Sequence, residues 1–403
     1  MLPSVTGRRA AGLAAAALLA AGLAAAADTR GLTADDLVEL KRLSGPAVSP
    51  DRGAVAYALR ETDREADRGR TDVWLRSLSA DGAQPRRLTN HPENDSAPAW
   101  SPDGERLYFL SSRSGSSQVW MMPLDFGEPL QVTDYPVPVS SFRIAPGGGG
   151  TLAFTAAVLP DCEADLACTA DRLAERAASA ATGRVYDRLM VRHWDRWEDG
   201  TISGLFTVRL GENGLSDGEP RLASARLVAH IPSRPFGGVA DYVFSADGRR
   251  LVFTAKPEGA GEAWSTDYDL YAVGVTGGRI ENLTEDNPGR DGHPVFSPDG
   301  GRLAWLSMAT AGYESDRRRI MLRDTDSGRT RRVAPDWDRS PNELAFSADG
   351  RELYAVAQDR GRRLLFRIDI DSGSVLPLTA TGTAGSVSVG PGSVVFVKHS
   401  LRA

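Results

Sequence analysis

The chain has 403 residues, of which 41% are hydrophobic and 25% charged, with a formal net charge of −6 and a pI of about 5.6. This is ordinary globular composition, long enough for one large domain or two smaller ones. Acidic and basic residues are interspersed without a basic block, which argues against a nucleic-acid partner.

The first 27 residues have the pattern of a signal peptide. Arg8 and Arg9 supply the positive start, an alanine-rich apolar run follows, and Ala25–Ala27 fits small-residue cleavage before Asp28. The alternative to a cleaved signal peptide is an uncleaved membrane anchor, but about 18 apolar residues are borderline for spanning a bilayer. The twin-arginine match is loose, and no cysteine follows for a lipoprotein anchor. We therefore predict cleavage, no stable membrane anchor, and a periplasmic or secreted protein.

A short phrase recurs after a predicted N-terminal helix and lead-in over 28–45. Its copies include "APAWSPDGERLYFLSS", "DYVFSADGRRLVFTAK" and "HPVFSPDGGRLAWLSM". The turns in these copies and their weaker relatives are separated by 52, 44, 100, 52, 50 and 43 residues, and they fall at Pro50-Asp51, Pro102-Asp103, Pro146-Gly147, Ala246-Asp247, Pro298-Asp299, Ala348-Asp349 and Pro391-Gly392. A period near 50 residues indicates a repeat architecture.

Each copy predicts a β-hairpin, with "DG" as its turn. The aspartate accepts from nearby backbone N–H groups and the glycine takes a positive φ, so we interpret the phrase as a folding device and not as a ligand site. Third strands are predicted at 71–78, 117–124, 204–210, 268–275, 318–325 and 363–370. Fourth strands with a recurring threonine are predicted at 86–90, 130–134, 281–285 and 376–380.

Four antiparallel strands per unit, repeated radially, make a β-propeller. There are seven hairpins but six third strands, because the last unit stops at Ala403. The sequence therefore predicts an all-β, seven-bladed β-propeller over 46–403, with the seventh blade incomplete and a helical insertion in blade three. Open strand edges invite aggregation, so we expect a truncated product whose continuation is missing.

Three segments together resemble the exported serine exopeptidases of the prolyl oligopeptidase family, of the acylaminoacyl-peptidase and type-five dipeptidyl-peptidase kinds. They are "LTADDLVELKRLSGPAVSPD" at 32–51, the SPDG blades, and "GRVYDRLMVRHWDRWEDG" at 183–200. In that family a propeller precedes an α/β-hydrolase domain with Ser, Asp and His in that order. The propeller caps the active site and helps hold the N-terminus of oligopeptide substrates. The resemblance implies that the hydrolase domain is absent from this chain, that the chain is inactive alone, and that no cofactor is needed.

A G-x-S-x-G match places a serine, Ser216, inside "RLGENGLSDGEPRLA". A nucleophile elbow needs a buried strand before the serine and a helix after it. Here a polar loop between the third and fourth strands of blade three is predicted, so Ser216 is not expected to be catalytic. No recognisable Ser and acid arrangement accompanies any of the five histidines, which are His91, His193, His230, His293 and His399.

The 100-residue step comes from an insertion arm over 159–200. Thr169 can cap a helix that runs to Thr182, with Gly183 as its stop. Export favours a disulfide between the two cysteines, Cys162 and Cys168, over two free thiols. No histidine lies near the pair, so no metal site is expected.

The arm ends in a dense group of aromatic and charged residues. Its acidic members could bind a peptide ammonium, its arginine a backbone carbonyl, and its tryptophans a side chain. The five candidate substrate-binding residues are Arg192, Trp194, Asp195, Trp197 and Glu198. The alternative is scaffolding, in which the cluster fixes the loop on its neighbours or on the absent hydrolase.

Three functions follow from these patterns. The first is the substrate-gating propeller of an exported serine exopeptidase, which recognises peptide N-termini. The second is a Tol-like periplasmic propeller that binds proteins, which does not explain the arm. The third is a propeller lyase with a histidine-bound metal, although the histidines lack motif spacing.

Overall fold

The computed structural model describes residues 31–400, except 52, 79–82, 125–126, 148–149, 188, 235, 258 and 260. The predicted signal peptide lies outside the described residues. By its internal contacts the chain divides into two units, Met1–Lys41 and Arg42–Ala403.

In the described part of the first unit, residues 31–41, the chain forms a short helix, α2 (Ala34–Glu39). A capping box fixes its start: the backbone N–H of Thr33 donates to the Asp36 carboxylate at 2.8 Å, and the Asp36 N–H donates to the Thr33 hydroxyl at 3.3 Å. Across the part of the chain that the structure describes, no helix is both long and apolar enough to cross a membrane.

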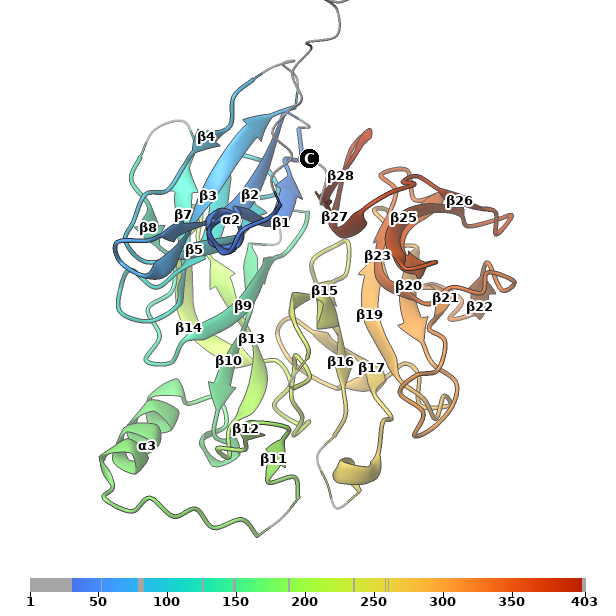
Figure 1. The fold of residues 1–403 in the computed structure, drawn as a ribbon. Helices are drawn as coiled ribbons and strands as arrows, with labels where there is room; N and C mark the ends of the chain where they lie inside the picture. Colours follow the sequence, from blue (N-terminus) through green and yellow to red (C-terminus); the bar gives the residue numbers. More distant parts are fainter. Residues whose placement is uncertain are drawn as a thin grey trace, which may run out of the picture. The chain divides into compact units, whose positions relative to one another are not determined.

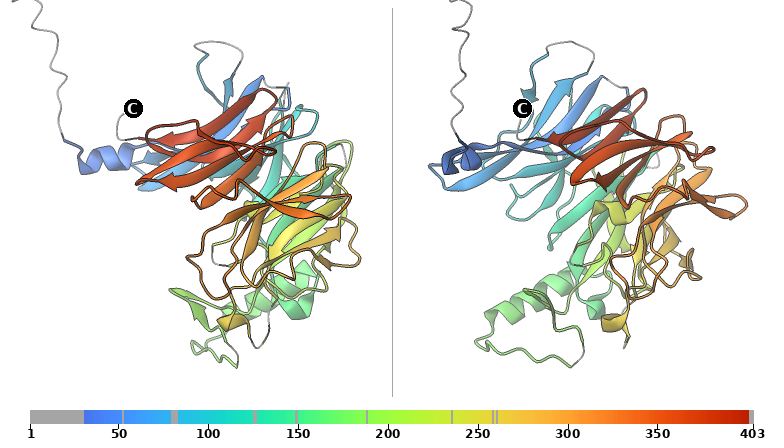
Figure 2. Two further views of the ribbon diagram at one scale, coloured as in Figure 1. Left: turned by 90° about the vertical axis from the view of Figure 1, so that its right-hand side faces the viewer. Right: turned by 45° about the vertical axis from the view of Figure 1, so that its right-hand side comes forward.

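The second unit is built from four-stranded antiparallel sheets, or blades, whose strands follow one another outward in chain order (Figures 1 and 2). Blade one holds β1 (Arg42–Val48), β2 (Ala54–Asp63), β3 (Arg68–Ser77) and β4 (Arg86–Arg87), and blade two holds β5 (Asp95–Trp100), β6 (Arg106–Ser111), β7 (Gln118–Pro123) and β8 (Leu130–Gln131). Blade three holds β9 (Val139–Ile144), β10 (Thr151–Val158), β13 (Ile202–Leu210) and β14 (Ser216–Leu222), and blade four holds β15 (Tyr242–Phe244), β16 (Arg250–Ala255), β17 (Asp269–Gly274) and β18 (Glu281–Asn282). Blade five holds β19 (Asp291–Phe296), β20 (Arg302–Ser307), β21 (Arg319–Asp324) and β22 (Thr330–Val333), and blade six begins with β23 (Pro341–Phe346), β24 (Glu352–Asp359), β25 (Arg362–Asp369) and β26 (Val375–Pro377).

The β-propeller is confirmed, but the expectation of seven blades is wrong: the described chain forms six. The last hairpin, β27 (Thr383–Gly390) and β28 (Ser393–His399), belongs to the sixth sheet, which β27 joins through a parallel bridge between Arg363 and Thr383. The hairpin also contacts the first blade, where the Val48 N–H donates to the Ser388 hydroxyl at 3.1 Å. With no third strand of its own, it takes its pairing from a neighbouring sheet.

The SPDG phrase is confirmed as a turn with one repeated hydrogen-bond network. In blade five the Ser297 hydroxyl donates to Asp299 at 2.5 Å and accepts from the Arg302 N–H at 2.9 Å, while the Gly301 N–H donates to Asp299 at 3.0 Å. Gly300 has φ 76°, which favours glycine. The hydroxyl and the backbone N–H hold the pKa of the Asp299 carboxyl below its usual value. The same serine–aspartate bond occurs in Ser49–Asp51, Ser101–Asp103, Ser245–Asp247 and Ser347–Asp349.

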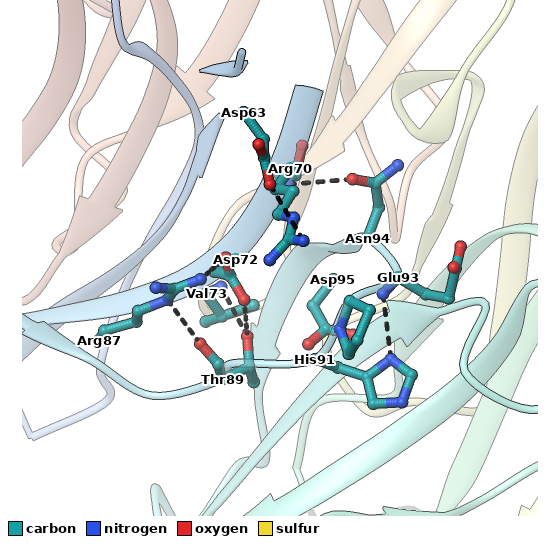
Figure 3. Close-up of polar contacts among 12 residues, drawn as sticks. Asp63, Arg70, Asp72, Val73, Arg87, Thr89, His91, Glu93, Asn94 and Asp95 are labelled. Carbon is teal, nitrogen blue, oxygen red and sulfur yellow. Dashed lines mark hydrogen bonds and ion pairs between the residues drawn. The ribbon is translucent and has the colours of Figure 1, made fainter. Parts of the chain in front are cut away.

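The threonine that recurs in the fourth strands makes hydrogen bonds within its own blade. In blade four, Thr284 accepts from the Leu270 N–H at 3.0 Å and donates to the Asp269 carboxylate at 2.9 Å. Figure 3 shows the counterpart in blade one, where Thr89 accepts from the Val73 N–H at 3.0 Å. The threonine therefore continues the strand pairing where the fourth strand leaves the sheet.

Chain order defines two ends of the blades, named here the turn end and the arm end. The turn end carries the SPDG turns between first and second strands. The arm end carries the connections between second and third strands and those between blades. The core lies between the sheets, where Phe154 stacks on Phe206 and Tyr135 at centroid distances of 5.3 and 4.9 Å.

Candidate functional site

The insertion arm leaves blade three at the arm end, between β10 and β13. It contains a short 3-10 helix, η1 (Pro160–Cys162), the helix α3 (Leu166–Ala178), and a small hairpin of β11 (Arg192–His193) and β12 (Arg196–Trp197). Figure 1 shows α3 and the hairpin projecting beyond the ends of β10 and β13. The arm therefore presents its side chains at one end of the blades.

The predicted boundaries of the helix are wrong. Asp165 caps it, with its carboxylate accepting from the Cys168 N–H at 2.8 Å, so α3 begins at Leu166 and ends at Ala178. Thr169 lies inside α3, where its buried hydroxyl accepts from the Leu159 N–H at 3.2 Å. The helix is capped four residues earlier than predicted, by Asp165 in place of Thr169.

The two cysteines form a disulfide, with the Sγ atoms 2.02 Å apart. Cys162 ends η1 and Cys168 lies in the first turn of α3, so the bond ties the start of the helix to the end of β10. Arg172 of α3 also pairs with Asp161 at 3.6 Å. The base of the arm is thus held by covalent and ionic contacts.

The β11–β12 hairpin brings two of the five candidate residues together. Arg192 is paired with Trp197 across the hairpin, and its guanidinium carbon lies 5.7 Å from the centroid of the Trp197 ring. Trp194 occupies the tip with φ 52° and is 71% exposed, while Trp197 is 58% exposed. Exposed tryptophans of this size commonly mark a binding surface.

A phenylalanine that sequence reasoning missed completes this surface. Phe236 is 71% exposed and lies 5.1 Å from the Trp194 ring and 5.8 Å from the His193 ring, centroid to centroid. It belongs to the connection between blades three and four, in the stretch "RPFGG". A bulky aromatic beside glycines in a connecting loop was the available signal, but its proximity to the arm is not visible in the sequence. We name Tyr186, His193, Trp194, Trp197 and Phe236 the arm surface.

The two acidic candidates lie at the turn of the hairpin and directly after it, where the Glu198 N–H donates to the Val191 carbonyl at 3.0 Å. Asp195 is exposed at the tip and has no hydrogen-bond or ion-pair partner among the described residues. Glu198 is half-buried, and its backbone carbonyl accepts from the Tyr186 hydroxyl at 3.2 Å. No ion pair joins these carboxylates to Arg192 within the described residues.

A network of hydrogen bonds joins the end of the arm, at Asp199 and Thr201, to blade three. Burial raises the pKa of Asp199, but hydrogen bonds from Thr201 at 2.7 and 2.9 Å and the charge of Arg234 hold it below its usual value. Arg234 also donates to the Ser203 hydroxyl at 3.0 Å. Burial, with the nearby Arg234, lowers the pKa of His230 to about 4. These hydrogen bonds tie the end of the arm to blade three.

Ser216 is not at a nucleophile elbow. It is the first residue of β14, an outer strand, and its register partner is Leu210. The predicted loop is therefore a strand at this residue, and no helix follows it. Within the described residues, no group of three His, Cys, Asp or Glu side chains could hold a metal.

Comparison with known proteins agrees with the β-propeller fold. A family model described as the TolB beta propeller domain matches residues 37–155. The chain is 29% identical to dipeptidyl-peptidase 5 of Porphyromonas gingivalis over 86% of this chain and 49% of that protein. It is 30% identical to a probable dipeptidyl-peptidase 5 of Arthroderma benhamiae over 89% of this chain and 51% of that protein.

Among solved structures, the chain resembles the acylaminoacyl peptidase of Pyrococcus horikoshii with a TM-score of 0.64 and 15% identity, over 90% of this chain and 50% of that one. That likeness shows the fold. The chain spans about half the length of the relatives that it matches. These comparisons confirm the resemblance to the prolyl oligopeptidase family: the chain is a β-propeller related in sequence to dipeptidyl-peptidase 5 and similar in fold to acylaminoacyl peptidase.

Proposed function

We propose that this propeller gates substrate entry and recognises the peptide N-terminus for an exported serine exopeptidase, of the dipeptidyl or acylaminoacyl type. The catalytic Ser, Asp and His would belong to an α/β-hydrolase domain outside these 403 residues, as the greater length of the relatives suggests. Oligopeptides would be the substrates, and the 403-residue chain would be inactive alone. Cleavage after residue 27 would deliver the protein to the periplasm or the medium.

One observation carries the proposal: the arm surface exposes two tryptophans and Phe236 next to an unpaired carboxylate, Asp195. Aromatic faces offer rigid apolar contact to a side chain, and a carboxylate binds an ammonium through charge-assisted hydrogen bonds. Glu198, directly after β12, would supply the second carboxylate. Arg192, already over the Trp197 ring, would reach a peptide carbonyl.

A Tol-like protein-binding propeller is less well supported. The TolB model matches residues 37–155 and so excludes the arm, whereas the dipeptidyl-peptidase 5 relatives align over 86–89% of the chain. Nothing in the SPDG turns favours a protein partner, because their serines and aspartates are engaged with one another.

The test measures binding of trialanine and acetyl-trialanine to the 403-residue chain by calorimetry. Loss of a hydrogen bond to a charged group costs about 1.5–3 kcal/mol, so acetylation should weaken binding about tenfold or more. The double variant Asp195→Asn, Glu198→Gln should lose that preference, whereas Glu105→Gln at the turn end should keep it. Equal affinity for both peptides in the unaltered chain, or an unchanged preference in the double variant, contradicts the proposal.

A further inference from the structure

A cavity of about 360 Å³ lies in blade six, on a different blade from the arm. Its walls come from the connection between β22 and β23, from the end of β24, from β25, and from the end of β26 with the residues after it. Figure 1 shows β25 and β26 well apart from α3 and β11. Small-molecule sites in proteins have volumes of about 300–1,000 Å³, so this cavity can hold a small ligand.

Two aromatic rings form a corner of the cavity. Trp337 and Phe366 lie edge to face, with their ring centroids 5.1 Å apart and their planes at 62°. Phe366 is 5% exposed and Trp337 is half-buried, so packing holds both rings. The other apolar walls are Leu364, Pro377 and Leu378. The corner therefore offers rigid apolar contact to a ring or a branched chain.

Backbone hydrogen bonds fix the walls of the cavity. The Trp337 N–H donates to the Ala334 carbonyl at 3.0 Å, which closes a turn, and the Trp337 carbonyl accepts from Arg317 at 3.2 Å. After β26, the Ala380 carbonyl accepts from Arg362 at 2.7 Å. Arg317 and Arg362 hold the walls but do not line the cavity. The cavity therefore has a defined shape without a ligand, which lowers the entropic cost of binding one.

Three charged side chains line the same cavity, namely Asp338, Arg339 and Asp359. The Nε and Nη2 atoms of Arg339 contact one oxygen of Asp359 at 2.8 and 2.6 Å, and its Nη1 atom donates to one oxygen of Asp338. Among the described residues, no donor is bonded to the second oxygen of either aspartate. The lining therefore has one negative charge in excess, with acceptor atoms left over beside two aromatic rings.

We propose that this cavity binds an organic ammonium ion with an apolar body. The ammonium donates to the remaining carboxylate oxygens of Asp338 and Asp359, and such charge-assisted hydrogen bonds are strong. A tryptophan face attracts a cation more than any other side-chain ring does, and Trp337 provides one. The apolar body fills the corner between the two rings. An anion of the same shape meets two carboxylates and a guanidinium whose three nitrogens are already engaged.

The adjacent strand argues against an added β-strand as the occupant. β26 has three residues, and the last of them, Pro377, has no backbone N–H to donate. An extended peptide therefore finds few partners along this edge, and the cavity takes a single group. A free amine and a lysine side chain of a protein share the ammonium chemistry, and the experiment distinguishes them. The proposal does not rest on recognition of peptides by the arm.

The first experiment titrates the 403-residue chain with phenethylammonium, phenethyl alcohol and phenylpropionate, which share a ring and differ in the charge of the end group. NMR follows the Trp337 indole N–H resonance, assigned with Trp337→Phe. Phenethylammonium should bind about fivefold or more tightly than the alcohol, and phenylpropionate should bind weakest. Equal affinities, tighter binding of phenylpropionate, or no shift with phenethylammonium would overturn the proposal.

The source of the ammonium is tested with Nα-acetyl-lysine methylamide in the same titration. If this probe binds more tightly than phenethylammonium, the cavity takes a lysine side chain of a protein. If it binds more weakly, the cavity takes a free amine with an aromatic body. Binding of neither probe at the Trp337 resonance counts against both sources and against the site.

The second experiment measures phenethylammonium binding to variants. Asp338→Asn should weaken binding about two- to fivefold, because it removes one exposed charge from the lining. The control Asp371→Asn makes the same charge change in the β25–β26 turn, outside the lining, and should leave the affinity unchanged. Trp337→Leu keeps apolar contact but removes the ring face, and should weaken binding about fivefold or more. Equal affinity in Asp338→Asn and its control, with Trp337→Leu also unchanged, refutes the site.

The double variant Asp195→Asn, Glu198→Gln separates this cavity from the arm surface. It should bind phenethylammonium as the unaltered chain does, because neither residue lines the cavity. If the double variant loses the amine while Asp338→Asn keeps it, the amine binds at the arm and the cavity proposal fails. A failure of trialanine to bind at the arm leaves the result at the cavity unaffected, so the two proposals fail independently.

Discussion

Asp291 provides a sharp test of the electrostatics inside blade five. Its carboxylate is 1% exposed and accepts from the Trp305 indole N–H and the Asn287 amide, both at 2.7 Å. Burial raises the pKa of Asp291 to about 6, and hydrogen bonds from Asn287, Ser307 and Trp305 only partly oppose this. The folded protein therefore holds a proton at pH values where the unfolded chain has lost it.

The sign and the size of the effect follow from linkage. Between the unfolded pKa of about 3.8 and the folded pKa of about 6 the folded state binds more protons, so the free energy of unfolding falls as pH rises. At 1.36 kcal/mol per pKa unit the full effect is about 3 kcal/mol, and about 2 kcal/mol of it falls between pH 4.5 and 7.5. The substitution Asp291→Asn removes the titration.

Urea unfolding of the unaltered chain and of Asp291→Asn, at pH 4.5 and at pH 7.5, measures this term. Relative to the variant, the unaltered chain should lose about 2 kcal/mol over that interval. The control Ile320→Val removes one buried methylene and should cost about 1 kcal/mol at both pH values. If the difference between the unaltered chain and Asp291→Asn is the same at both pH values, the reasoning fails.

Two further predictions concern the fold and catalysis. Thr284→Val should lower the free energy of unfolding by about 2 kcal/mol, because it removes the acceptor of the Leu270 N–H and the donor to Asp269. The control Thr276→Val, at an exposed residue, should change the free energy of unfolding by less than about 0.5 kcal/mol. Denaturant titration of both variants measures the two changes. The 403-residue chain should release no chromophore from dipeptidyl or acyl-aminoacyl substrates, and turnover that Ser216→Ala abolishes would contradict our placement of that serine.

Local signals in the sequence predicted local structure well. The serine and aspartate of the SPDG phrase satisfy the backbone groups within five residues of themselves, so the turn can be read without knowing its neighbours. The third strand predicted at 268–275 differs from β17 by one residue at each end. The helix of the arm was placed too late because Asp165, outside the predicted span, caps it.

Features that depend on distant residues could not be predicted. The blade count was wrong because the last hairpin pairs according to its neighbours in space, through Arg363 and Thr383. Phe236 and Trp194 are 42 positions apart in the sequence, and their rings are in contact because the connection between blades three and four passes close to the arm.

Hydrogen–deuterium exchange of the chain with and without saturating trialanine tests the central claim most directly, because it maps where a peptide is held. The account predicts slower exchange in the backbone amides of 186–198 and 236–241, with no change in the SPDG turns. Protection confined to the turn end, or none in the arm under conditions where calorimetry shows binding, would contradict it.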